Sequence, residues 1–137
     1  MLLMLAAVAA VPTPECQGVP IRNMIARYAA LQKSQDVDGI ARLFGSNGVV
    51  DNPGAKPVRG AAAIRAFLGG FHGFDVTSNE LTVGNVAKAD DGWHVTGRFH
   101  QTGSTPDAKS YDVTGSFDSS WTCAAGGWQV RRMATGK

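Results

Sequence analysis

The chain has 137 residues, which is the length of a single domain. Hydrophobic residues make up 44% of it and charged residues 18%, so it can bury a core and is not a disordered tail. Its net charge is only +2 and its charges are scattered, which argues against a nucleic acid as its partner.

The first residues form an apolar segment that is typical of an export signal. Residues 2–11 are all apolar, are too few to span a membrane, and contain the small-x-small motif Ala7-Val8-Ala9. No Lys or Arg precedes Arg22, so a packed N-terminal helix is the alternative. We expect a periplasmic or secreted protein with no membrane contact once its signal is removed. The expected divisions are a signal peptide over 1–10, a short segment over 11–19 and one domain over 20–137.

The two cysteines, Cys16 and Cys123, fit export, because an even number of cysteines in an oxidising compartment usually pairs. A disulfide between them would pin the mature N-terminus to a late strand. The alternative is two unrelated buried thiols.

Helices are predicted between residues 20 and 70 by apolar residues three and four positions apart. The first starts at Pro20, a residue favoured in the first turn, and the second follows the capping residue Asp36 and ends at Gly45. The third follows Gly60. The apolar stripes are Ile21, Met24, Ile25, Tyr28 and Leu31 in the first helix, Val37, Ile40, Ala41 and Phe44 in the second, and Ile64, Phe67 and Leu68 in the third.

The second half of the chain changes to a period of two, which is typical of strands. In the clearest case Phe117, Ser119 and Trp121 share one face, and every residue on the other face is polar. Such a strand has one face on a core and the other on water or an interface. The predicted strands are 48–51, before an Asn52-Pro53-Gly54 turn, and then 81–89, 93–102, 111–123 and 128–134.

Helices followed by a long antiparallel sheet predict an α+β fold. Gly97 and Gly115 lie inside strands, where glycine permits a sharp bend. A bent sheet with three N-terminal helices on its concave face forms a cone, and the aromatic side of the strands would line its hollow.

This element order resembles the NTF2-like superfamily, and within it the SnoaL-like and ketosteroid-isomerase-like proteins. The segments Ala26-Arg27-Tyr28, 38–44, 49–54 and 57–67 carry the likeness, which spans the chain from about residue 20 to its end. The resemblance implies the cone-shaped NTF2-like, or cystatin-like, roll. This superfamily contains isomerases, cyclases, dehydratases and non-catalytic binding or assembly domains, so the fold does not by itself define an activity.

The resemblance also implies a general base, an aspartate after the short strand that moves a proton beside a ketone. Asp51 occupies this place when counted back from Gly60, and Asn52 occupies it when counted forward from Phe44. Both residues could instead merely shape the turn. Tyr28 matches a tyrosine of the first helix that reaches into the pocket, where it would donate a hydrogen bond to a carbonyl; the alternative is an ordinary core aromatic.

A second role in the isomerases is a protonated aspartic acid that stabilises the developing oxyanion, as in the ketosteroid isomerase example. In this chain the corresponding place falls on Ser119. Steroid isomerase activity is therefore disfavoured, although Ser119 or Tyr111 could donate a weaker hydrogen bond.

The histidines do not form a metal site. His94 and His100 lie on one strand face with Arg98, roughly 20 Å apart at about 3.3 Å per residue, which is too far for one ion. We expect this face to be the outer one, solvated or used for a homodimer. His72 lies near the expected pocket mouth, either as an acid/base or as a loop histidine. No sequence motif points to a metal, nucleotide or other cofactor.

The resulting hypothesis is an exported domain that binds a small, mostly apolar molecule in its cone. One alternative is an isomerase or cyclase that transfers a proton next to a ketone, with Asp51 as base and Tyr28 as donor. The other is a protein-interaction domain with a filled interior. The remaining expected lining residues are Phe44, Phe67, His72, Trp93, Phe99, Tyr111, Phe117, Ser119 and Trp121.

Overall fold

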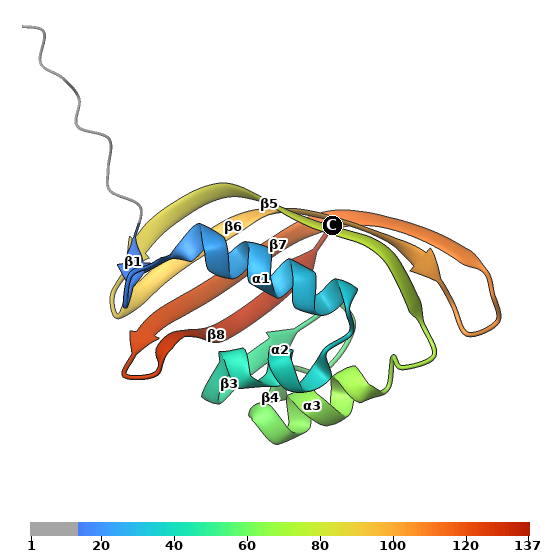
Figure 1. The fold of residues 1–137 in the computed structure, drawn as a ribbon, viewed down its shortest axis with the longest axis horizontal. Helices are drawn as coiled ribbons and strands as arrows, with labels where there is room; N and C mark the ends of the chain where they lie inside the picture. The colour runs from blue at the N-terminus through green and yellow to red at the C-terminus, as the bar shows by residue number, and fades with distance from the viewer. Residues whose placement is uncertain (1–13) are drawn as a thin grey trace, which may run out of the picture.

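The computed structural model describes residues 14–137, which form an open, curved sheet with helices on one side (Figure 1). The expected signal peptide lies outside the described residues. No helix in the described part of the chain is long and apolar enough to cross a membrane. The elements are β1 (Glu15–Cys16), β2 (Val19–Pro20), α1 (Ile21–Lys33), α2 (Val37–Leu43), β3 (Phe44–Asp51), β4 (Val58–Arg59), α3 (Ala61–Gly69), β5 (Asp75–Ala89), β6 (Gly92–Ser104), β7 (Ser110–Ala124) and β8 (Gly127–Gly136).

The main sheet has six strands in the order β4-β3-β8-β7-β6-β5, and β1 pairs with β2 separately. All neighbours in the main sheet are antiparallel except β3 and β8, which are parallel. The sequence predicted only antiparallel pairs, because it cannot show a pairing between strands so far apart in the chain. Strands β5, β6 and β7 arch over α1, so the side facing α1 is concave and the other side is convex (Figure 1).

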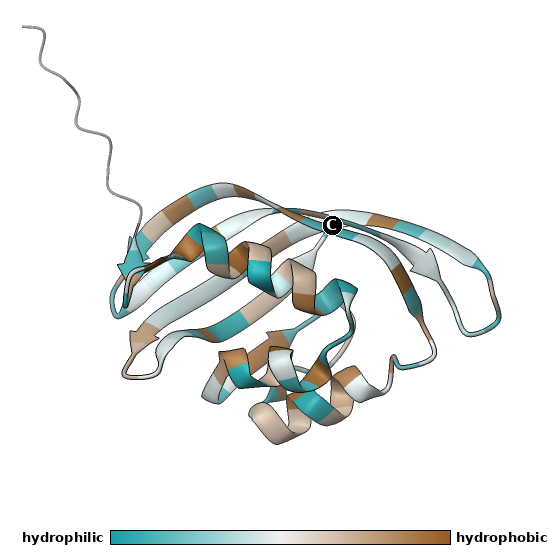
Figure 2. Ribbon diagram, in the orientation of Figure 1, coloured by the Kyte–Doolittle hydropathy of each residue, from teal (hydrophilic) through white to brown (hydrophobic). Residues whose placement is uncertain are grey.

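Helix α1 lies against the concave face through its apolar stripe. Ile21, Met24, Ile25 and Tyr28 are each at most 7% exposed, as their spacing predicted. The helix shows alternating hydrophobic and hydrophilic residues in Figure 2. Its most extensive contact with the main sheet is with β5. The helix therefore covers part of the concave face, and its polar side faces away from the sheet.

Helix α2 begins where the sequence predicted, because the Asp36 side chain accepts a hydrogen bond of 2.9 Å from the Gly39 backbone N–H. The helix ends one residue earlier than expected, and Phe44 is the first residue of β3. Helix α3 packs on α2 and β3. Its buried residue Ile64 is inaccessible to solvent, which anchors this helical layer to the core.

The alternation along β7 is confirmed. Phe117, Ser119 and Trp121 are buried at 2%, 0% and 0% exposure, whereas Asp118 and Ser120 on the convex side are partly exposed. A shift of one residue would have reversed the two faces. The rings therefore point to the side covered by the helices.

Several short or irregular elements were not predicted. Strands β1, β2 and β4 have two residues each, too few to show a period. Strand β5 begins at Asp75 instead of residue 81, because an irregular register between Val76 and Ser78 interrupts the alternation in its first part.

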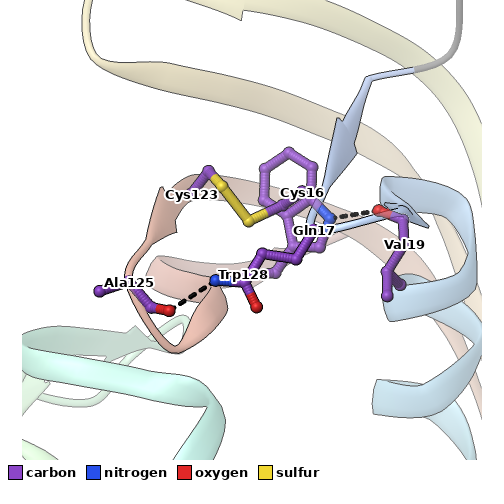
Figure 3. Close-up of a disulfide and its surroundings, with 6 residues drawn as sticks. All are labelled: Cys16, Gln17, Val19, Cys123, Ala125 and Trp128. Carbon is purple, nitrogen blue, oxygen red and sulfur yellow. Dashed lines mark hydrogen bonds between the residues drawn. A yellow bond between two sulfur atoms is a disulfide. The ribbon is translucent and has the colours of Figure 1, made fainter.

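The expected disulfide is present between Cys16 and Cys123, whose Cα atoms are 5.6 Å apart (Figure 3). It joins the β1–β2 hairpin to the end of β7. Two hydrogen bonds support the same junction: Trp128 Nε1 donates to the Val19 carbonyl at 2.7 Å, and the Gln17 amide donates to the Ala125 carbonyl. The start of α1 is thereby fixed to the β7–β8 turn.

Candidate functional site

A run of aromatic rings borders the concave face beyond α3. Phe67 contacts Phe71 edge to face at a centroid distance of 5.4 Å, Phe71 contacts Phe74 at 5.5 Å, and Phe74 contacts Tyr111 of β7 at 6.4 Å. Phe71 is 44% exposed, and Val113, on the same face of β7 as Tyr111, is 46% exposed. We call these five residues the aromatic rim.

A chain of polar side chains adjoins the rim and crosses the concave face. The Tyr111 hydroxyl donates to the Gln101 side chain at 3.1 Å, and the Gln101 amide donates to Asn79 at 3.1 Å. The Asn79 amide donates to Gln32 of α1 at 2.9 Å and to the Ala29 carbonyl at 3.0 Å. These contacts tie α1 to β5, β6 and β7, and they place amide and phenol groups beside the exposed rings.

Tyr28 lies one helical turn before Gln32 and is only 4% exposed, with its ring edge to face with Phe44 at 6.3 Å. Burial raises the pKa of Tyr28, and no hydrogen bond or charge contributes to the rise. Among the described residues, every fully buried side-chain nitrogen or oxygen has a hydrogen-bond partner. The raised pKa keeps the Tyr28 hydroxyl neutral, so it can act as a hydrogen-bond donor.

Asp51 lies on the convex face. It pairs with Ala134 of β8 and shares that side of the sheet with Asp118. The Arg132 guanidinium donates to the Asp51 carboxylate at 2.7 Å. The structure therefore does not bring Asp51 and Tyr28 together, because the sheet lies between them.

Asn52 follows the end of β3, and its side-chain oxygen accepts a hydrogen bond of 2.8 Å from the Thr135 hydroxyl. Thr135 pairs with Phe117, whose ring is on the concave side. The sequence left open whether Asp51 or Asn52 occupies the position of the general base. Asn52, the residue reached by counting forward from Phe44, lies toward the concave face. That residue is an amide, not a carboxylate.

Ser119 is fully buried, and its hydrogen bonds are used inside the protein. Its hydroxyl donates to the Val95 carbonyl at 2.8 Å and accepts from Trp121 Nε1 at 2.9 Å. It is therefore not free to donate to a ligand. Phe44, Phe117 and Trp121, expected to line the pocket, are packed in the same core.

The other expected lining residues are spread over three places. Phe67 and Tyr111 belong to the aromatic rim, and Phe99 is half-buried on the concave face, opposite Gly115. Trp93 is half-buried at the far end of β6. His72 is exposed, and its Nδ1 lies 3.1 Å from the Gly69 carbonyl at the end of α3.

Sequence reasoning missed the polar chain and most of the rim. Gln32, Asn79 and Gln101 are ordinary polar residues that only the register of β5 with β6 brings together. Phe71 and Phe74 could have been found only from the closeness of several phenylalanines in the sequence after α3, where neither a helical nor a strand period applies.

The outer face carries His94 and His100, as predicted. His94 Nε2 contacts the Asp118 carboxylate, and His100 Nε2 lies 2.7 Å from the Asp112 carboxylate. Both pairs join β6 to β7 on the convex side. Each histidine thus has its own partner.

The chain was compared with known proteins. The family model described as SnoaL-like domain matches residues 19–134, and no curated protein matches the chain. Three similar solved structures are a putative aromatic ring hydroxylase from Novosphingobium aromaticivorans (21% identity, 84% of each chain, TM-score 0.72), a ketosteroid isomerase-like protein from Erwinia carotovora atroseptica (16%, 82% of this chain and 90% of that one, 0.73), and an NTF2-like protein with a cystatin-like fold from Novosphingobium aromaticivorans (21%, 84% and 77%, 0.65). At these identities the likeness to the solved structures establishes the fold, which is the predicted α+β roll.

Proposed function

Because the chain belongs to the SnoaL-like domain family, we propose that it binds a small, mostly apolar molecule on the concave side of its sheet. The observation that carries this proposal is the exposed aromatic rim next to the polar chain of Tyr111, Gln101, Asn79 and Gln32.

The rim supplies the apolar contact. Phe71 and Val113 are two of the most exposed large hydrophobic residues among those described. The ring contacts connect Phe71 to Tyr111, and Val113 lies two residues after Tyr111 on the same face of β7. Covering such a surface removes apolar area from water, which is the main favourable term in binding small apolar ligands. A continuous exposed patch of this kind commonly marks a binding site.

The polar chain supplies orientation. Binding sites for small molecules combine apolar walls with a few convergent polar groups. Gln32, Asn79 and Gln101 offer amides, and Tyr28 holds a neutral hydroxyl on the same helix as Gln32. A ligand with one carbonyl or hydroxyl group and an apolar body suits this arrangement.

The placement of Asp51 favours binding over proton transfer. A general base must reach the proton that it removes, directly or through one water. Asp51 is on the opposite side of the sheet and paired with Arg132, whereas Asn52, on the concave side, cannot act as a carboxylate base. Non-catalytic binding is therefore the function that we propose.

The test is a titration of the protein with a panel of steroids, aromatic polyketides and fatty acids, followed by calorimetry. We expect at least one class to bind, and Phe71→Ala to weaken its binding at least tenfold. Val19→Ser is the matched control, because Val19 is also an exposed large hydrophobic residue, 38% exposed, but lies in the β1–β2 hairpin. Asp51→Asn should bind as tightly as the wild type. No binding from the whole panel, or equal binding by Phe71→Ala, would contradict the proposal.

We also propose that the protein is exported. The Cys16–Cys123 disulfide supports this, since such bonds persist mainly in oxidising compartments. Cell fractionation should recover the full chain outside the cytoplasm, and a chain lacking residues 2–11 inside it. Cytoplasmic retention of the full chain would contradict export.

A further inference from the structure

The convex face has a groove of about 490 Å³ at the end of the sheet where β3, β8, β7 and β6 lie side by side. Residues 45–49 of β3 and Arg59 of β4 form one wall, and residues 89–93 around the β5–β6 turn form the other. The floor contains Ser120, Thr122 and Gln129 of the two middle strands. The groove is separated from the aromatic rim by the sheet, so it is a second, independent candidate site.

Two irregular registers build this groove. Ser120 pairs with Arg132, but the next residue, Trp121, pairs with Val130, so Arg131 is an extra residue in β8. In a regular strand neighbouring side chains point to opposite faces, whereas a bulge re-aims one of them. Arg131 and Arg132 consequently both line the groove.

The facing part of β3 bulges further. Phe44 pairs with Val130 and Val49 with Arg132, so four residues of β3 lie opposite the single Arg131. This extra length forms the wall of the groove. Gly48 allows the tight arch, because a Cβ there would come within 2.8 Å of the Phe44 ring.

Two arginines flank Val49. Arg59 pairs with Val49 from one side and Arg132 pairs with it from the other, so the three residues share the convex face. At about 4.8 Å between strands, the two arginine Cα atoms are roughly 10 Å apart. Val49 is 9% exposed and has a short side chain, so it fills little of the space between the two arginines.

The groove has an excess of positive charge. Arg59, Arg131 and Arg132 line it, against one lining carboxylate, Asp91. Arg131 pairs with Asp91, and Arg132 pairs with Asp51 and lies 3.9 Å from Asp118, both just beyond the groove, but Arg59 donates only to the Asn47 carbonyl, at 3.3 Å. No ion pair joins Arg59 to a carboxylate in residues 14–137.

The existing ion pairs can yield to a ligand. The side chains of Arg131 and Arg132 are 51% and 45% exposed. Exposed pairs of this kind contribute little stability, so replacing one of their carboxylates with an incoming anion costs little. Guanidinium groups bind carboxylate, phosphate and sulfate oxygens in a bidentate geometry.

The opposite wall is formed by residues 89–93 around the β5–β6 turn. The groove thus offers arginine cations on one side and the hydroxyl and amide groups of Ser120, Thr122 and Gln129 on its floor. Its volume lies within the range of sites for small organic molecules.

We propose that this convex groove binds a small organic anion, with its carboxylate, phosphate or sulfate group held between Arg59 and Arg132 and the rest of the molecule over the hydroxyl and amide groups of the floor.

The test is an NMR titration of the ¹⁵N-labelled full chain at low salt. The probes are phenyl phosphate and benzoate, with benzyl alcohol as the neutral analogue and inorganic phosphate as the head group alone. We expect one of the aromatic anions to shift the backbone amide signals of Ser120 and Thr122, to bind at least tenfold more tightly than benzyl alcohol, and to weaken with added salt. The stronger of the two identifies the preferred head group.

Variants locate the site. Arg59→Gln should weaken binding of the anion at least tenfold, and Arg59→Lys should weaken it less because the charge remains. Arg98→Gln is the control of equal charge change, since Arg98 lies on the convex face outside the groove. Equal losses in Arg59→Gln and Arg98→Gln, or equal binding of the neutral analogue, would overturn the proposal.

A second copy of the chain is the competing occupant of this face. Sedimentation of the wild type and Arg59→Gln separates the two ideas. A dimer that dissociates in Arg59→Gln, without anion binding to the wild type, would show that the face serves self-association and that the proposal is wrong.

Discussion

Phe117 of β7 lies directly opposite Gly97 of β6, and its ring covers the place where a side chain of Gly97 would be. A Cβ atom on Gly97 would come within 2.7 Å of the Phe117 ring. Phe99 and Gly115 stand in the same relation two residues further along the strands. Cross-strand pairs of a ring and a glycine let the sheet bend sharply while the ring fills the space. The curvature of the concave face thus rests partly on these glycines.

Replacing Gly97 should disturb this bend. In Gly97→Ala the new methyl group would overlap the Thr82 carbonyl oxygen as well as the Phe117 ring. We expect the free energy of unfolding to fall by about 1–3 kcal/mol, as for overpacked core sites. Urea denaturation measures it, with Gly126→Ala as the control, because a Cβ on Gly126 meets nothing within 4 Å. Equal stability of the two variants would contradict this role of Gly97.

The parts of the fold that depend on local periodicity were predictable from the sequence. The buried stripe of α1 and the alternation of Phe117 and Trp121 follow from side-chain spacing alone. The disulfide followed from the number of cysteines and the expected compartment.

The candidate sites were less predictable, because they depend on register between distant strands. Because Arg131 is an extra residue in β8, the consecutive residues Arg131 and Arg132 both line one groove. No periodic pattern in the sequence reveals such a bulge. Asp51 and Asn52 differ by one position, and that position decides which face of the sheet each side chain takes.

The Cys16–Cys123 bond should contribute strongly to stability. It closes a sequence separation of 107 residues, and in the chain-entropy model a loop of about this length is worth on the order of 4–5 kcal/mol. The Cys16→Ser/Cys123→Ser protein should lose most of that amount in guanidinium denaturation. The wild type under reducing conditions should match it. A thiol reagent should label the oxidised native protein only after reduction, and full labelling without reductant would contradict the bond.

Tyr28 should make the protein sensitive to alkali. Burial raises the pKa of Tyr28 above its ordinary value of 10.0, so the folded state holds the phenol proton more tightly than the unfolded chain. This contribution to stability is fully present below about pH 10 and is lost as the pH rises further. Tyr28→Phe should therefore show a smaller loss of stability than the wild type when urea midpoints are compared from about pH 8 to about pH 11.

Tyr111 provides the comparison for this experiment. Its pKa is also raised, first by partial burial and then by the charge of Asp75, but it lies at the exposed rim. Tyr111→Phe should retain most of the alkaline loss that Tyr28 causes. Parallel loss in the wild type and Tyr28→Phe would show that the Tyr28 phenol does not control the transition.

Ser119 and Trp121 form a buried polar pair that should be sensitive to deletion of one member. Ser119 is fully buried and accepts the Trp121 indole N–H while donating to the Val95 carbonyl. In Ser119→Ala the indole N–H is left in the core without an acceptor, which costs about 1–3 kcal/mol. Ser119→Cys, which keeps a weak acceptor, should lose less stability, and the free energies of unfolding of the wild type and the two variants in denaturant test this order.

The hydroxyl of Ser119 is committed to these two partners, so Ser119→Ala should leave the affinity for a concave-side ligand unchanged. A large loss of affinity without loss of stability would instead assign Ser119 to the ligand.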